Sequence, residues 1–164
     1  AEIEAYYKNN PDNFQLRDFV VQADYVIVDK NAPKLRRVER WAASSDNDDR
    51  EKLIEYAVQF AKEFHFDEED WLYVDDLFKK IPIQTLNTEN FLKQNTFVTV
   101  EDSMSVYFLK LKAYKLKDDT APLSLQREFI RNIILNKWKL NLISTMKKGI
   151  LDEAKQNQRI EYYP

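Results

Sequence analysis

The stretch PLSLQREFIRNIILNKWKLNLISTMKKGILDEAKQNQRIEYYP, residues 122–164, is the part of the chain around which the rest is arranged. Its apolar residues recur three or four positions apart, which is the spacing of one face of an α-helix. Because Ser124 is a good N-cap, the pattern predicts a helix from Leu125 to about Gln156, roughly 48 Å long at ~1.5 Å per residue. The apolar residues that define it are Leu125, Phe129, Ile130, Ile133, Ile134, Trp138, Leu142, Met146, Ile150 and Ala154.

The apolar residues of this predicted helix cover more than one face. Ile130, Ile134 and Trp138 lie on one side, and Leu142 extends the apolar surface round to the next. We therefore expect the helix to have partners on more than one face. Gly149, the only glycine in the chain, costs roughly 1 kcal/mol relative to Ala inside a helix. Its position predicts a bend or a close contact there.

Composition limits the function classes that need to be considered. The chain has 164 residues, and its 44% hydrophobic content is sufficient for a core. With 28 acidic and 25 basic residues it has a net charge of -3, which argues against a nucleic-acid partner. No apolar run is long enough to span a membrane. The absence of Cys excludes disulfides and thiolate chemistry.

We expect no cofactor and no metal site. The acidic runs at 46–49 and 67–70 lack the glycine and the terminal Glu of an EF-hand, so we interpret them as solvated loops. His65 is the only histidine, and we interpret it as structural because it lies between Phe64 and Phe66 at a predicted helix end.

The remaining pattern predicts an α+β fold. Residues 19–28 alternate as a strand does and are apolar on both faces, which indicates a central strand. We expect a small antiparallel or mixed sheet with helices, a long C-terminal helix and a flanking N-terminal helix. The other expected elements are a helix end at 1–10, helices at 33–42, 49–64, 75–80 and from 88, a short strand at 71–74, and a hairpin of strands 97–100 and 104–114.

The two helical ends are rich in aromatic residues. The two helical ends contain too few residues to bury all of their aromatic side chains. Apolar surface that stays exposed would mark a contact site for another polypeptide. The sequence opens inside a predicted helix, so we expect a longer protein. Cover of this surface by the N-terminal part of that protein is an alternative of equal weight to a contact with another polypeptide. The long helix also has an excess of Lys and Arg, which we interpret as a solvated face. The aromatic residues in question are Tyr6, Tyr7, Trp138, Tyr162 and Tyr163.

The chain resembles the SurA-type periplasmic chaperones of the parvulin (rotamase) peptidyl-prolyl isomerase family, and is most similar to divergent members from Bacteroidetes. Three segments account for the resemblance: AEIEAYYKNNPDNF at the start, the sheet from DFVVQADYVIV to SVYFLKLKAYK, and the C-terminal helix with its IEYY ending. It implies the end of a chaperone helix at 1–14, a degenerate parvulin-like domain at 15–117, and a long helix with a short terminal strand at 118–164.

Active members of this family have a histidine in the first strand and another in the last, in motifs like SHILV and GYHII. Here the matching stretches read ADYVIV and SVYFLK, so Tyr25 and Tyr107 occupy the histidine positions. We expect a non-catalytic domain, and an active isomerase that uses these tyrosines is the alternative.

The resemblance implies a periplasmic chaperone that binds unfolded outer-membrane or secreted polypeptides. Its expected partners are these clients and the N-terminal part of its own chain, with no nucleic acid and no membrane span. The residues expected to contact clients are Tyr6, Tyr7, Ile134 and Trp138. A structural or adaptor module that docks on a partner is a further alternative.

Overall fold

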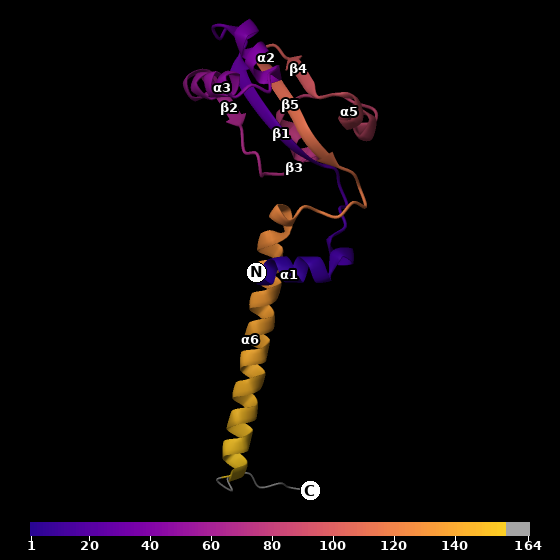
Figure 1. Cartoon of the computed structure of the whole chain (residues 1–164), viewed down its shortest axis with the longest axis vertical. Coiled ribbons are helices and arrows are strands. Elements are labelled where there is room, and N and C mark those ends of the chain that lie inside the picture. Colours follow the sequence, from indigo (N-terminus) through magenta and orange to yellow (C-terminus); the bar gives the residue numbers. More distant parts are fainter. Residues whose placement is uncertain (157–164) are drawn as a thin grey trace. The chain divides into compact units, whose positions relative to one another are not determined.

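The computed structural model describes residues 1–156 of the chain. The chain forms two compact units, one of Asp12–Leu125 and one that joins Ala1–Pro11 to the chain from Gln126 onward. The first unit contains the sheet, and the second contains the helices at the two ends of the chain (Figure 1). Within the described part, no helix is long and apolar enough to cross a membrane.

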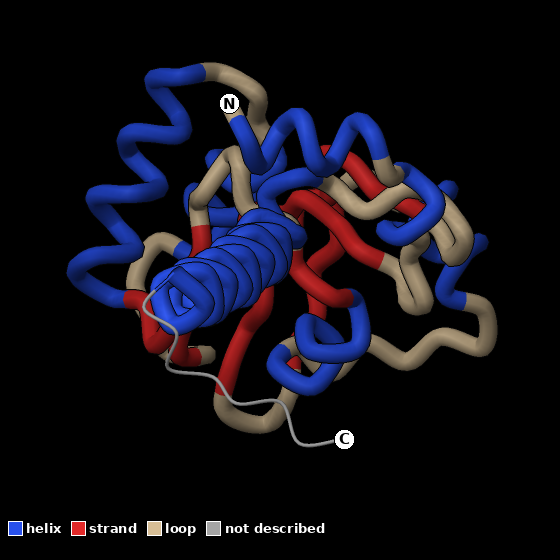
Figure 2. The backbone as a smooth tube through the Cα atoms, turned by 90° about the horizontal axis from the view of Figure 1, so that it is seen from below, coloured by secondary structure: helices blue, strands red, loops and turns tan. Residues whose placement is uncertain are grey.

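The strands form one antiparallel sheet in the order β2-β1-β5-β4, with β3 paired to the start of β1 (red in Figure 2). As predicted, β1 is central, and eight of its ten residues are buried. The β4–β5 turn is fixed by Asp102, whose carboxylate accepts hydrogen bonds from the backbone N–H groups of Met104 and Ser105, both at 2.7 Å. The strands are β1 (Val20–Asp29), β2 (Ala61–His65), β3 (Leu72–Tyr73), β4 (Phe97–Glu101) and β5 (Ser105–Lys115). The α+β class is thereby confirmed.

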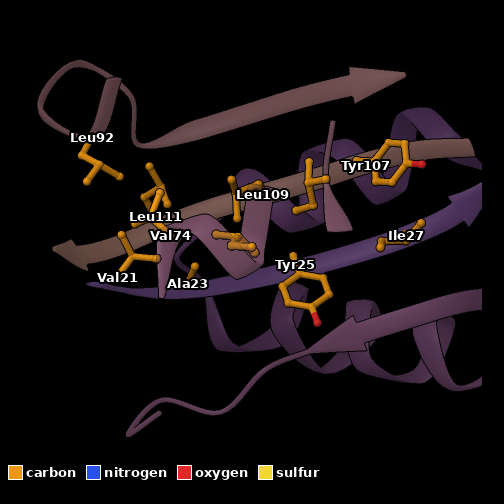
Figure 3. Close-up of a cluster of buried hydrophobic side chains, with 11 residues drawn as sticks. Val21, Ala23, Tyr25, Ile27, Val74, Leu92, Tyr107, Leu109 and Leu111 are labelled. Atoms are coloured by element: carbon orange, nitrogen blue, oxygen red, sulfur yellow. The ribbon is translucent and has the colours of Figure 1, made fainter. Parts of the chain in front are cut away.

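Helices cover both faces of the sheet. On one face lie α2 (Leu35–Ala43) and α3 (Asn47–Phe60), and the Asp46 carboxylate caps α3 by accepting from the Asp48 N–H at 3.0 Å. On the other face lie α4 (Val74–Lys80) and α5 (Thr88–Gln94). Because side chains alternate along a strand, β1 supplies both cores. The α2/α3 core contains Val26, Val28, Val38, Leu53, Ala57 and Phe108, and the α4/α5 core contains Val21, Ala23, Tyr25, Ile27, Leu77, Ile81, Tyr107 and Leu109 (Figure 3).

The chain enters and leaves the sheet unit along neighbouring segments. A short 3₁₀ helix, Pro11–Phe14, precedes β1. The Ala121 N–H donates to the Phe14 carbonyl at 2.7 Å, and the Leu16 N–H donates to the Asp119 carbonyl at 2.8 Å. These hydrogen bonds fix the two ends of the sheet unit beside each other.

The other unit contains α1 (Glu2–Asn9) and α6 (Leu123–Gln156). The 34 residues of α6 correspond to a length of about 51 Å at ~1.5 Å per residue, in agreement with the predicted long helix. Ile130 is the one fully buried residue of α6 within the described chain. Within its own unit, α6 is contacted by α1 through the cation–π contact of Lys137 with Tyr6.

Three further predictions differ from the structure or lie outside it. The helix predicted at 49–64 ends at Phe60, and residues 61–65 pair with β1 instead, because the unpaired edge of β1 offers hydrogen bonds that outweigh local propensity. A Cβ at Gly149 would meet no atom within 4 Å, so the close contact predicted there was wrong. The predicted IEYY strand, with Tyr162 and Tyr163, lies outside the described residues.

Candidate functional site

Tyr25 lies on β1 with its ring in the α4/α5 core and its hydroxyl at the edge of that core. The hydroxyl donates to Glu63 Oε1 of β2 at 2.8 Å, and Lys80 Nζ of α4 donates to the Tyr25 oxygen at 3.1 Å. Lys80 Nζ also lies 2.5 Å from Glu63 Oε1. Three elements therefore hold one compact polar group around a single tyrosine.

The protonation of this group is set by burial and by its internal hydrogen bonds. Burial, followed by the hydrogen bond to Glu63, raises the pKa of Tyr25 above its usual value. The hydrogen bonds from Lys80 and Tyr25 lower the pKa of Glu63, and the same Glu63 contact raises the pKa of Lys80. At neutral pH the phenol is thus protonated between an ionised carboxylate and an ammonium group, which makes Tyr25 a poor general base.

Tyr107 lies on β5 and has a carboxylate partner of its own. Its hydroxyl donates to Asp102 Oδ2 at 2.6 Å, in the turn that starts the strand. This hydrogen bond raises the pKa of Tyr107 and lowers the pKa of Asp102. The Asp102 carboxylate therefore accepts hydrogen bonds both from the backbone of the turn and from the Tyr107 hydroxyl.

The two tyrosines do not form one polar cluster. Tyr25 pairs with Leu109 and Tyr107 pairs with Ile27, so the two rings are on the same face but two positions apart in register. Their hydroxyls point in different directions (Figure 3), each toward its own carboxylate. Because acid–base groups act on one bond only when they converge on it, this arrangement differs from a shared catalytic site.

A small hollow of about 210 Å³ opens beside Tyr25. Its volume falls below the ~300–1,000 Å³ range of small-molecule sites, so it is suited to a single side chain. The lining residues are Tyr25, Trp71, Leu72, Tyr73, Asp76, Leu77 and Lys80.

A second hollow, of about 430 Å³, lies between α1 and α6. Tyr6, Ile134 and Trp138, three of the four residues expected to contact clients, line it, whereas Tyr7 does not. Adjacent residues of a helix point ~100° apart, which explains why Tyr6 and Tyr7 separate. Lys137 Nζ stands 4.7 Å above the Tyr6 ring centroid, in a cation–π contact.

Most of the apolar surface of α6 is exposed in the described chain. Trp138 is 55% exposed and Leu140 is 67% exposed. Isolated exposed apolar residues are ordinary, but many large ones within a short stretch of one helix indicate an interaction surface. We call this series the α6 apolar surface, and it consists of Phe129, Leu135, Trp138, Leu140, Leu142, Ile143, Met146, Ile150 and Leu151.

The sequence analysis missed a charged network on the α2/α3 face of the sheet. Asp24 is 8% exposed, and its Oδ2 lies 2.9 Å from Arg50 Nη1 and 2.8 Å from Lys112 Nζ. Arg50 also donates to the Phe66 carbonyl at 2.8 Å, and Glu68 lies 3.3 Å from the same guanidinium. The signal in the sequence was an acid inside an apolar strand, which requires a partner when buried. The network joins β1, α3 and β5.

His65 and the acidic side chains are the candidate metal ligands of the described chain. Within residues 1–156, no group of three His, Asp or Glu side chains is arranged to hold a metal ion. His65 Nε2 lies 3.5 Å from Asp70, and its ring stacks on Tyr25 at a centroid distance of 5.7 Å. His65 therefore packs at the end of β2 and not at a helix end.

Neither a protein-family model nor a curated protein matches the sequence. Among solved structures, the chain is similar to one from Campylobacter jejuni, where the virulence factor PEB4 and the periplasmic protein Cj1289 are structurally related SurA-like chaperones. The sequence identity is 15% and the TM-score is 0.42. The match covers 99% of this chain and 63% of the other, so the chain spans less than two thirds of that structure. A likeness of this strength assigns the chain to no family.

Proposed function

We propose that the chain is the parvulin-like and C-terminal part of a SurA-type periplasmic chaperone that binds unfolded outer-membrane or secreted polypeptides. The α6 apolar surface is the observation on which the proposal depends. It places nine large apolar side chains, each at least 40% exposed, within residues 129–151. The α1/α6 hollow adds Tyr6 and Ile134 beside Trp138.

Such a surface suits weak and adaptable binding. Apolar contact contributes roughly 25 cal/mol per Å² removed from water, while the ordering of an unfolded client opposes association. Trp138 offers a large rigid contact, and Met146 fits irregular shapes because its side chain is flexible. Clients of different sequence are therefore held and released without a single fixed pose.

The sheet domain contributes no catalysis under this proposal. Rotation about a peptide bond has a barrier of ~18–20 kcal/mol, and lowering it requires polar groups that converge on one bond. The hydroxyls of Tyr25 and Tyr107 are each held by a separate carboxylate. That geometry supports a structural role for both tyrosines.

Light scattering from an aggregating unfolded outer-membrane protein tests the proposal. The wild-type chain is expected to suppress aggregation, and Leu140→Gln with Leu142→Gln is expected to weaken the suppression. Leu and Gln have similar helix propensity, so α6 is retained. The control Asn136→Gln with Ser144→Gln alters exposed polar positions of the same helix and is expected to behave as wild type. Absence of suppression by the wild-type chain would overturn the proposal.

Two further measurements separate the proposal from its alternatives. A protease-coupled proline-peptide assay is expected to show no catalysis, whereas catalysis abolished by Tyr107→Phe would establish an isomerase. Purification of the chain with a stoichiometric protein on α6, in place of varied clients, would establish an adaptor.

A further inference from the structure

The charge of the chain is unevenly distributed. Residues 129–151 contain five Lys or Arg and no Asp or Glu. The other 141 residues contain 28 acidic and 20 basic residues, which gives them a net charge of -8. One positive segment therefore lies in an otherwise acidic chain.

This positive segment coincides with the α6 apolar surface, since all nine exposed apolar residues lie within it. Lys139 is three or four positions from Leu135, Leu142 and Ile143, and residues so spaced are neighbours on a helix. Lys137 lies at the α1/α6 hollow, above the Tyr6 ring.

The lysines of the segment form no ion pair in the part of the chain that the structure describes, although Asp152 follows Lys148 by four positions. Within residues 1–156, no carboxylate lies within 4.0 Å of Lys137, Lys139, Lys147 or Lys148. Arg131 has an ion pair with Glu128 at 3.6 Å, with both side chains more than half exposed. Most of the positive charge is thus available to a partner.

We infer that the α6 apolar surface selects polypeptide segments that combine apolar side chains with carboxylates and lack Lys and Arg. The inference rests on the proposed function and names the class of client. The carboxylates of such a client lie beside the lysines of α6, while the apolar side chains of the client cover the α6 apolar surface. Complementary charge raises the association rate and disfavours partners of the same sign.

The alternative occupants fit the observations less well. A helix that lies on a lipid surface separates its apolar and polar faces, whereas Leu140 and Leu142, both exposed, point ~160° apart on α6. A second copy of α6 would set one positive segment against another, which opposes association. A flexible polypeptide that winds partly round the helix meets neither difficulty.

Fluorescence anisotropy with two labelled peptides of equal length tests this inference. Both have the same apolar pattern, and the polar positions are Glu in one and Lys in the other. The Glu peptide is expected to bind about tenfold more tightly, and the difference is expected to shrink between about 0.1 M and about 1 M salt as the Debye length falls from ~10 Å to ~3 Å. Lys139→Glu with Lys147→Glu is expected to remove the preference. The control Arg36→Glu with Arg37→Glu makes the same charge change at exposed positions of α2 and is expected to keep it.

The outcomes that count against the inference are distinct. Equal binding of the two peptides, together with suppression of aggregation, would overturn the charge preference and leave the proposed function in place. Binding to vesicles of phosphatidylglycerol and phosphatidylcholine without any peptide preference would overturn the choice of a polypeptide. Failure to bind either peptide, together with failure to suppress aggregation, would overturn the proposed function itself.

Discussion

Removal of the Asp24 carboxylate tests the charged network that joins β1, α3 and β5. In Asp24→Ala, Arg50 and Lys112 lose a shared partner at 2.9 Å and 2.8 Å. Hydrogen bonds to charged groups contribute ~1.5–3 kcal/mol each, and loss of one member of a buried pair costs ~3–5 kcal/mol. The two cations are about one-quarter exposed and Glu68 still lies beside them. Solvent and Glu68 therefore reduce the expected loss of unfolding free energy to about 2–3 kcal/mol.

Urea denaturation followed by tryptophan fluorescence measures this loss. With an m-value of ~2 kcal/mol per molar urea, the middle of the usual range, the midpoint is expected to fall by about 1–1.5 M. The control is Glu101→Ala, whose ion pair with Lys30 at 3.7 Å joins two exposed side chains, so its effect is expected to be below about 0.5 kcal/mol. If Asp24→Ala moved the midpoint no further than Glu101→Ala, the network would not stabilise the sheet unit.

Three other measurements address the core, the pH dependence and the long helix. Leu109→Ala, at a fully buried position, is expected to lower the unfolding free energy by about 3 kcal/mol, whereas Leu86→Ala, at a fully exposed one, is expected to change it by less than about 0.5 kcal/mol in the same urea experiment. The folded-state pKa values of Glu63 and Asp102 are lowered, so the stability that they contribute is present above the usual carboxyl pKa of about 4 and is lost as the pH falls through the lowered values. Glu63→Gln with Asp102→Asn is expected to flatten this loss in a series of acid titrations, and an unchanged slope would contradict the assignment. Gly149→Ala is expected to stabilise α6 by about 1 kcal/mol because nothing lies within 4 Å of an added Cβ, and circular dichroism that showed reduced helicity would reveal a contact that the structure lacks.

The elements with strong local periodicity were predictable from the sequence. The helical spacing from Leu125 onward predicted α6, and the two apolar faces of residues 19–28 predicted that β1 is central. The β2 strand could not be predicted because Ala57, Ala61 and Phe64 continue the helical spacing of α3. Only pairing with β1 makes residues 61–65 a strand, and pairing of that kind is set by distant residues.

The candidate site was likewise predictable only where local sequence patterns determine it. Strand alternation predicted that Tyr25 and Tyr107 lie on strands of the sheet. Their carboxylate partners could not be predicted, because Glu63 lies on the missed strand and Asp102 contacts Tyr107 only through the turn geometry. The α1/α6 hollow could not be predicted either, since its two sides are more than 120 residues apart in the sequence.

Site-specific photocrosslinking tests the central claim, that unfolded polypeptides bind to the α6 apolar surface, most directly. A photoreactive phenylalanine analogue at Leu142, which is 61% exposed on α6, is compared with one at Leu86, which is fully exposed on the sheet unit. We predict crosslinks from position 142 to an unfolded outer-membrane protein, and few from position 86 or to the same protein once folded. Equal crosslinking from the two positions, or none from position 142, would contradict the claim.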